Sequence, residues 1–168
     1  MKLFRSVGDA SLGIGVAVAL ALLVITIMVA LAGDLPDLDL TPGVARTDIT
    51  QENICKTKWG KDKRFVTAKM KREVFEEYGL SGNHDRSCRS KRHFEIDHLI
   101  SRELGGADDV KNLWPQCYGG EWNAVLKDRL ENRLHKEVCA GNLSLEQAQK
   151  EIVEDWRVPY REYFGEPE

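Results

Sequence analysis

The sequence predicts an α+β fold, in which a small and mainly helical domain is built around two short strands and follows an N-terminal hydrophobic helix. Apolar residues recur at helical spacing in three segments beyond residue 60, and the segment 93–100 alternates in the way a strand does. The segment 11–33 is uncharged and almost wholly apolar. A chain of 168 residues suits a single domain with its own core.

The apolar segment predicts delivery across a membrane. About 20 apolar residues span a bilayer, so residues 12–32 suit a retained membrane anchor. The segment also contains Ala30-Leu31-Ala32, the small-x-small pattern of a cleavage site, so residues 1–32 equally suit a signal peptide. Lys2 and Arg5 hold the N-terminus in the cytoplasm under both interpretations. We therefore expect the rest of the chain outside the cytoplasm, either periplasmic, secreted or membrane-anchored.

Composition divides the rest of the chain into a linker and a domain. Residues 33–49 contain Pro36, Pro42 and Gly43 together with four aspartates and little periodicity, which predicts a linker. The folded domain is expected over residues 50–168, beginning where Thr50 can cap a short helix.

Periodicity and end signals predict the elements of this domain. Helices are expected over 66–78, 121–139 and 144–156, the last opened by a capping box of Ser144 and Gln147. Residues 81–92 are expected to form a polar loop. Residues 93–100 and 110–114 are expected to be strands joined through the Gly105-Gly106 turn, with Pro115 ending the second strand.

Four cysteines lie in the part expected to be exported, and none belongs to a C-x-x-C pair, which argues against a zinc ribbon. In an oxidising compartment two disulfides are the default, with four buried thiols as the alternative. Four cysteines allow three pairings, and we favour Cys88–Cys117 with Cys55–Cys139. Cys88 precedes the first strand and Cys117 follows Trp114 on the second, so both approach the open end of a hairpin.

Charge is unevenly distributed along the chain. Residues 33–168 contain 22 basic and 26 acidic side chains, a balance that does not by itself indicate nucleic-acid binding. Residues 56–93 contain 12 Lys and Arg against 5 Asp and Glu, so a local basic face is expected, although a solvated charged helix gives the same count. The residues expected to contact nucleic acid are Lys69, Arg72, Arg89, Lys91 and Arg92.

The segment 95–127 contains a set of side chains suited to phosphodiester hydrolysis. A hard divalent cation needs oxygen ligands, which Asp97 and Asn123 can supply. The imidazole of His98 has the ordinary pKa of a general base, and a backbone carbonyl near Asn112 would orient it. Lys127, one helical turn after Asn123, would neutralise a neighbouring phosphate. We interpret His135, further along the same helix, as structural.

These residues resemble the HNH nucleases, whose ββα-metal motif has an Asp or His before a catalytic His, a structural Asn in the second strand region and a metal ligand on the helix. Asp97-His98, Asn112 and Asn123 match those positions in order. The chain is also similar to a group of small bacterial HNH-like proteins over roughly residues 50 to 164. The shared phrases are Ile54-Cys55, Lys58-Trp59, Asp97 to Gly106, Asn112 to Pro115, and Lys127 to Gly141.

The resemblance implies a domain built around a ββα-metal motif that hydrolyses phosphodiester bonds with one divalent cation. This chain has Ser101 where many members have Pro, and Asn123 where many have His. An Asn ligand favours Mg²⁺ over Zn²⁺, with Mn²⁺ as an alternative. With only two protein ligands, weak retention of the metal is expected.

Two functions are therefore weighed. The first is an exported endonuclease acting on DNA, with RNA as an alternative substrate. The second is a non-catalytic, envelope-anchored module of the same fold that binds nucleic acid or has a structural role. The combination of Asp97 and His98 favours the enzyme, because a pure binder needs no base beside a metal ligand. The net acidity of the exported part favours the second function.

Overall fold

The structure is a computed structural model that describes residues 34–167, so the apolar segment predicted to be an anchor or signal peptide lies outside the described residues. The described chain is a mixture of helix and sheet, which agrees with the predicted α+β class. Among these residues, none of the helices is both long and apolar enough to cross a bilayer. The elements are α2 (Gln51–Lys56), α3 (Ala68–Glu77), β1 (Phe94–His98), η1 (Arg102–Leu104), η2 (Val110–Asn112), β2 (Leu113–Cys117), α4 (Ala124–Ala140), α5 (Leu145–Asp155) and α6 (Arg157–Phe164).

The two strands form an antiparallel pair in which Ile96 lies opposite Pro115 and His98 lies opposite Leu113. The prediction that Pro115 ends the second strand is wrong, since β2 continues through it to Cys117. Proline is tolerated because this sheet has two strands only, and each strand has a free edge where no ladder N–H is needed. Residues 110–112, which were predicted to begin the second strand, instead form a 3₁₀ turn capped by the side chain of Asp109.

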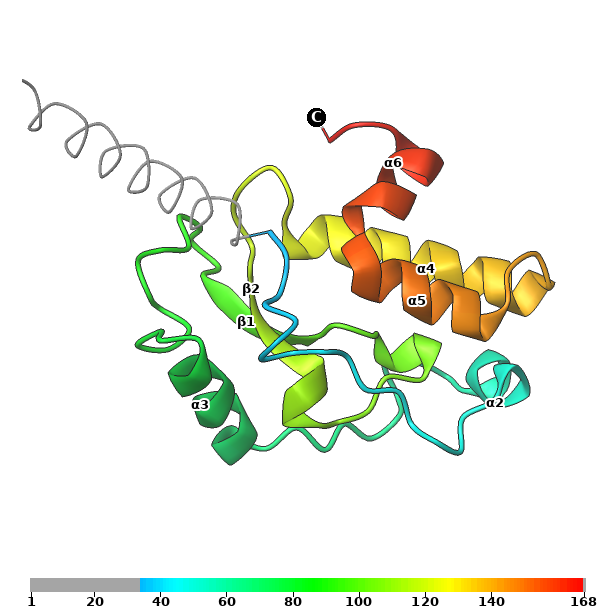
Figure 1. Cartoon of the computed structure of the whole chain (residues 1–168), viewed down its shortest axis with the longest axis horizontal. Coiled ribbons are helices and arrows are strands. Elements are labelled where there is room, and N and C mark those ends of the chain that lie inside the picture. Colours follow the sequence, from blue (N-terminus) through cyan, green and yellow to red (C-terminus); the bar gives the residue numbers. More distant parts are fainter. Residues whose placement is uncertain (1–33, 168) are drawn as a thin grey trace, which may run out of the picture. The chain divides into compact units, whose positions relative to one another are not determined.

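Helices cover both sides of this hairpin, with α3 on one side and α4 and α5 on the other (Figure 1). Val74 of α3 packs with Ile96 and Leu113 in a small apolar cluster. The larger core gathers apolar residues of α2, α4, α5 and α6 around Leu104, which is fully buried. The hairpin therefore lies between two apolar layers, and each face of β1 meets a different set of helices.

Thr50 and Ser144 cap helices as predicted, whereas α3 and α4 begin two and three residues later than expected, after Thr67 and Asn123. Thr50 and Asn53 form a capping box at α2, and Thr67 accepts from the backbone of Met70 at α3. Ser144 accepts from the N–H of Gln147 at α5, as a capping residue should. The side chain of Gln147 instead donates to Glu151, so only half of the predicted box is formed.

Helix α6 is absent from the sequence predictions. It follows α5 after a single residue, Trp156, which keeps a right-handed helical backbone at the junction. Pro159 lies in the first turn of α6, where a missing N–H costs no helical hydrogen bond. Trp156, Tyr160 and Phe164 recur every four residues, a helical pattern that the sequence predictions did not use. Trp156 and Tyr160 are buried in the larger core, and Phe164 packs against it.

Residues 34–49, predicted as a linker, are packed against the domain. Thr41 is buried and its hydroxyl donates to the carbonyl of Leu113 at 2.9 Å. Ala45 forms a β-bridge with Gly106, and Asp34 accepts from the indole of Trp156. The linker prediction is therefore wrong for these residues, because backbone pairing with non-local partners replaces the local periodicity that a sequence pattern can detect.

Both predicted disulfides are present. Cys88–Cys117 closes the open end of the hairpin, and Cys55–Cys139 joins α2 to the end of α4. Described cysteines are all paired, so the alternative of four free thiols is excluded. The two bridges are compatible with an oxidising, extracytoplasmic compartment.

Candidate functional site

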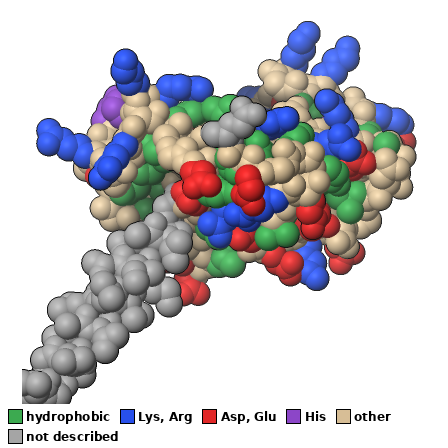
Figure 2. Space-filling model, turned by 90° about the horizontal axis from the view of Figure 1, so that it is seen from above, with side chains coloured by type: hydrophobic (Ala, Val, Ile, Leu, Met, Phe, Trp, Pro, Cys, Tyr) green, Lys and Arg blue, Asp and Glu red, His purple; other side chains and the backbone are tan. Residues whose placement is uncertain are grey.

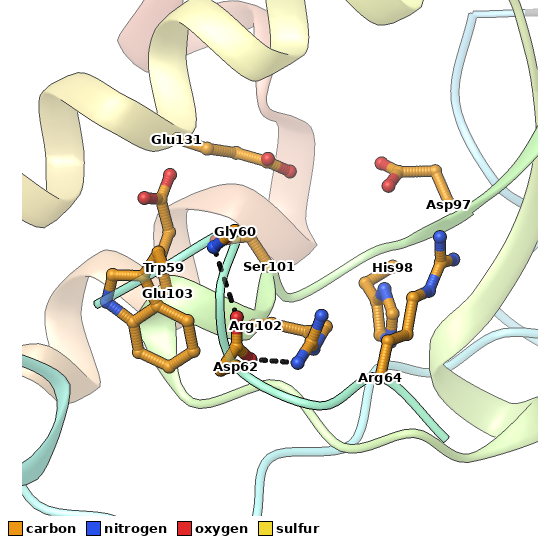
Figure 3. Close-up of a pocket in the computed structure, with 10 residues that line it drawn as sticks. All are labelled: Trp59, Gly60, Asp62, Arg64, Asp97, His98, Ser101, Arg102, Glu103 and Glu131. Carbon is orange, nitrogen blue, oxygen red and sulfur yellow. Dashed lines mark hydrogen bonds and ion pairs between the residues drawn. The ribbon is translucent and has the colours of Figure 1, made fainter. Parts of the chain in front are cut away.

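A pocket of about 200 Å³ lies at the end of β1 and contains two of the predicted site residues, Asp97 and His98. Figure 3 shows the Asp97 and Glu131 carboxylates pointing toward one another across this pocket, with Arg64 beside His98. The complete lining is Trp59, Gly60, Asp62, Arg64, Asp97, His98, Ser101, Arg102, Glu103 and Glu131.

Strand alternation sends the two neighbouring site residues in different directions. His98 follows Ile96 toward the side of α3, whereas Asp97 faces α4. The expectation that Ile96 and His98 share a face therefore agrees with the structure. Because His98 is the last residue of β1, both side chains still reach the same pocket.

His98 is oriented by Asp108, a residue that the sequence predictions did not include. The Nε2 atom of His98 lies 2.8 Å from Oδ1 of Asp108. A carboxylate only accepts hydrogen bonds, so Nε2 carries the proton and Nδ1 keeps the lone pair of a base. Asp108 is itself held because Oδ2 accepts from the backbone N–H of Phe65 at 2.6 Å.

The surroundings keep the His98 imidazole neutral near pH 7. Burial lowers its pKa below the ordinary value, and the Asp97 and Asp108 carboxylates oppose this shift without cancelling it. The nearby Arg64 guanidinium lowers the pKa further. For Asp108, burial acts to raise the pKa, but the bonds from Phe65 and His98 outweigh it and the carboxyl stays ionised.

Asn112 acts on the backbone rather than on the imidazole. Its Oδ1 accepts from the N–H of Ile100, and its Nδ2 donates to the carbonyls of Ile100 and Ala107, each at 3.0 Å. The backbone carbonyl of Asn112 accepts from Leu99, so the prediction that a carbonyl near Asn112 orients His98 is wrong at this position. Asn112 instead closes the loop between the strands, which places Asp108 next to His98.

Only glycine fits at one point of this loop. A side chain on Gly106 would lie 1.7 Å from the carbonyl oxygen of Ile100, and Gly106 donates its N–H to Ser101. The close approach of these two backbone segments lets Asn112 bond to both. The Gly105-Gly106 pair predicted as a turn therefore has a second role in positioning Asp108.

The predicted role of Lys127, neutralising a phosphate, requires its side chain to face the substrate, and the structure places it elsewhere. Its side chain is fully buried, and its ammonium donates to Oδ2 of Asp97 at 2.8 Å, to the carbonyl of His98 at 2.7 Å, and to Glu131. An ammonium has three protons, and all three are used. Lys127 therefore positions Asp97 and the end of β1, and it has no donor left for a phosphate.

This buried group contains two carboxylates and one ammonium, so its charges do not balance. Burial acts to raise the pKa of Asp97, but Lys127 outweighs it and holds that pKa below the ordinary value. Burial raises the pKa of Glu131 well above its ordinary value, and Lys127 only partly opposes this. Burial would lower the pKa of Lys127, but the two carboxylates raise it instead. Lys127 therefore stabilises the ionised form of Asp97 more effectively than that of Glu131.

Asn123 lies outside the pocket lining and is used as a helix cap. Its Oδ1 accepts from the backbone N–H groups of Val125 and Leu126, at 3.0 and 3.3 Å. Two accepted bonds use both lone pairs of that oxygen. The structure thus does not bring Asn123 to Asp97, and Asn123 instead caps the start of α4.

Two arginines in the pocket were also missed by the sequence predictions. Arg64 donates to the carbonyl of Ile96 at 2.8 Å, and Arg102 pairs with Asp62 and lies 3.9 Å from Asp108. Guanidinium groups bind phosphate oxygens well because their donors form a planar fork. Arg102 lies within the shared phrase Asp97 to Gly106, whereas no quoted motif includes Arg64, and the fold places both beside His98.

The pocket contains oxygen donors of the kind that a divalent cation prefers, although among residues 34–167 no three of its carboxylates lie close enough together to form a ligand cluster. Asp97 uses one oxygen for Lys127 and keeps further lone pairs, while Glu131 and Glu103 are partly desolvated carboxyls whose pKa values are raised by burial. Oxygen donors of this kind suit hard cations such as Mg²⁺. A cation there would offset the desolvation that raises both pKa values.

The residues predicted to bind nucleic acid lie on the α3 side of the hairpin. Arg72 lines a second cavity of about 510 Å³, together with Lys71, Phe75 and Arg64, which also lines the first pocket. Lys69 is exposed on α3, and Arg89, Lys91 and Arg92 are exposed in the loop 81–92. Arg92 stacks on the ring of Tyr118 at 3.7 Å. Figure 2 shows Lys and Arg side chains projecting from both ends of one face, with Asp and Glu gathered between them.

No protein-family model matches the chain, and neither a curated protein nor a solved structure is significantly similar to it. The HNH resemblance therefore stays a prediction from the quoted residues.

We expect removal of the buried Lys127 ammonium to lower the free energy of unfolding strongly and in a pH-dependent way. Lys127→Met leaves Asp97 and Glu131 buried without a counter-charge, so the free energy of unfolding should fall by about 3–5 kcal/mol at neutral pH. The loss should shrink at acidic pH, where protonated carboxyls need no counter-charge. Urea unfolding followed by circular dichroism measures both values.

Lys136→Met on the same helix is the matched control, because Lys136 is exposed. It should change stability by less than about 0.5 kcal/mol. Equal effects of the two substitutions at every pH would show that the Lys127 ion pair does not contribute to stability.

Proposed function

We propose that this chain is a metal-dependent endonuclease that hydrolyses phosphodiester bonds, with His98 as the general base. The observation that carries the proposal is the 2.8 Å bond between His98 Nε2 and Asp108, in a pocket shared with Asp97 and Arg64. A neutral, oriented imidazole beside an anionic ligand and a guanidinium is the set that base-assisted hydrolysis of a phosphodiester requires.

The residues in and around the pocket have separate roles in this proposal. His98 Nδ1 removes a proton from the attacking water, and Asp108 keeps the ring in the required tautomer and stabilises the imidazolium that forms. Arg64 and Arg102 bind the non-bridging oxygens of the phosphate. Lys127 and Asn112 are positioning residues, because they hold Asp97 and the loop with Asp108 in place.

Asp97, with Glu131 as its neighbour across the pocket, would hold a divalent cation such as Mg²⁺. When bound, the cation would neutralise charge on the phosphate and on the leaving oxygen. The pocket carboxylates of Asp62, Asp97, Glu103 and Glu131 outnumber the cationic side chains around them, which favours retention of such an ion.

The substrate proposed is DNA, with RNA as an alternative, outside the cytoplasm. The two disulfides support an oxidising compartment, and the cavity beside α3 supplies basic and aromatic groups near the pocket. Because Arg64 lines both cavities, a strand bound along α3 would continue to His98.

A second candidate is a non-catalytic nucleic-acid-binding or structural module of the same fold. One observation favours it: the Lys127 ammonium already supplies Asp97 with a cation. The two functions differ in a single readout, which is cleavage that requires a divalent cation.

His98→Ala should slow plasmid cleavage by roughly 10²–10⁴-fold, the usual contribution of a positioned base. The assay uses the purified full-length chain in mild detergent, supercoiled plasmid, and Mg²⁺ or Mn²⁺ with or without EDTA. His84→Ala is the control, since His84 is exposed in the loop 81–92 and should retain full activity. Parental cleavage by His98→Ala, or cleavage unaffected by EDTA, would overturn the proposal.

The pH profile separates Asp108 from a merely structural residue. Because the pKa of His98 is lowered, the acidic limb of kcat/KM should lie below pH 6.5, the ordinary value for histidine. Asp108 raises that pKa, so Asp108→Asn should move the limb to lower pH while reducing the plateau rate. Asp109→Asn is the control, because its carboxylate bonds to Lys111. A limb that stays in place or moves upward would contradict the assigned role.

Charge reversal beside the second cavity should weaken DNA binding regardless of sequence. Lys71→Glu with Arg72→Glu, introduced into the inactive His98→Ala chain, removes two cationic groups and should flatten the dependence of affinity on salt by about one unit per lost phosphate contact. Fluorescence anisotropy across a salt series measures this slope. The exposed pair Lys136→Glu and Lys150→Glu should leave the slope unchanged, and the reverse pattern would place the DNA on the other side of the domain.

A further inference from the structure

A second histidine-containing cluster lies away from the pocket, at the disulfide between α2 and α4. His135 precedes Cys139 by one helical turn, so the two side chains share a face of α4. Nε2 of His135 lies 3.5 Å from Sγ of Cys139, and the ligand atoms of Cys55, His135 and Cys139 all lie within 4.8 Å of one another. The sequence interpretation of His135 as structural did not consider this arrangement.

Nε2 of His135 is the ring nitrogen that faces this cluster. It lies 3.3 Å from the indole nitrogen of Trp59, a donor, and 3.2 Å from the carbonyl oxygen of Ile54, an acceptor. The same indole N–H donates to that carbonyl at 3.0 Å. In the tautomer whose proton is on Nδ1, Nε2 has the lone pair that coordinates a metal ion. If Nε2 binds a metal, Trp59 keeps its bond to Ile54.

We propose that Cys55, His135 and Cys139 form a zinc site when their disulfide is reduced. Two thiolates and one imidazole are ligands that Zn²⁺ prefers, and a water molecule would complete its tetrahedral coordination. Zn–S and Zn–N bonds of about 2.3 and 2.0 Å place ligand atoms within about 4 Å of one another. Nε2 of His135 already lies 3.5 Å from Sγ of Cys139, and the two sulfurs would move apart once their bond is broken. Oxidised and zinc-bound states therefore exclude each other.

The conversion needs a dithiol reductant, such as a thioredoxin-type protein. Its two thiols transfer two electrons and two protons to the Cys55–Cys139 bond, which breaks into two thiols while the reductant becomes a disulfide. Zn²⁺ then replaces one proton on each thiol, and both protons pass to solvent. Cys55 and Cys139 are both exposed, so the reductant and the ion can reach them.

The other disulfide offers an internal comparison. Cys88 is buried, with 4% of its surface exposed, and within residues 34–167 the Cys88–Cys117 pair belongs to no cluster of three ligand atoms. Both bridges become dithiols under full reduction, but only one has an imidazole beside it. A zinc ion at the Cys55 site would also keep α2 tied to α4, as the disulfide does.

The test uses the full-length chain, reduced with a phosphine and titrated with Co²⁺ as a spectroscopic probe and with Zn²⁺. One ion per reduced chain is expected, with thiolate-to-cobalt charge-transfer absorption that Zn²⁺ abolishes by displacement. The oxidised chain should show none of this absorption. In addition, Zn²⁺ should protect Cys55 and Cys139 from alkylation, mapped by mass spectrometry, and leave Cys88 and Cys117 unprotected.

Two variants complete the experiment. His135→Gln should weaken zinc binding by at least tenfold without preventing disulfide formation, whereas Cys88→Ser with Cys117→Ser should leave zinc binding unchanged. The alkylation map of the parental chain needs no variant, so it decides the question even if a substitution impairs folding. Absence of charge-transfer absorption, equal protection of all four cysteines, or parental affinity in His135→Gln would each overturn the proposal.

Discussion

The ammonium group of Lys127 is the contact on which the candidate site depends. It lies buried between α4 and β1, where it bonds to the side chain of Asp97, the backbone carbonyl of His98 and the side chain of Glu131. A buried charge without partners is too costly to keep, so the helix and the strand must stay together for all three bonds to persist. One side chain thus sets both the direction of Asp97 and the position of the backbone that carries His98.

The loop that carries Asp108, on the other side of His98, is held in place by hydrogen bonds between neutral groups. Asn112 joins the two ends of the loop that follows β1, and Gly106 allows the backbone of that loop to approach Ile100 closely. This closure brings Asp108 to within hydrogen-bonding distance of His98. Asn112, which we predicted to lie near the group that orients His98, therefore contributes through geometry. The carboxylate that contacts the imidazole belongs to Asp108, ten residues after His98 in the chain.

Much of the fold could be predicted because its signals are local. Helix periodicity and capping residues placed α3, α4 and α5 to within a few residues, and alternation placed β1. The two disulfides also followed, since hairpin geometry brings Cys88 to Cys117 and leaves Cys55 for Cys139. Two failures are non-local: the packing of residues 34–49 and the continuation of β2 through Pro115 depend on partners distant in sequence. Helix α6 had a local signal, the recurrence of Trp156, Tyr160 and Phe164, which the predictions did not use.

The sequence by itself determined the order of elements, the cysteine pairing and the placement of Asp97 next to His98 at the end of a strand, because each depends on spacing along the chain. The tertiary structure decided which groups surround them. Asp108, Arg64 and Arg102 joined the pocket, Asn123 remained a helix cap, and Lys127 turned inward. The physical reason is that a side chain's pKa and available hydrogen bonds depend on its neighbours in space, which no local pattern specifies.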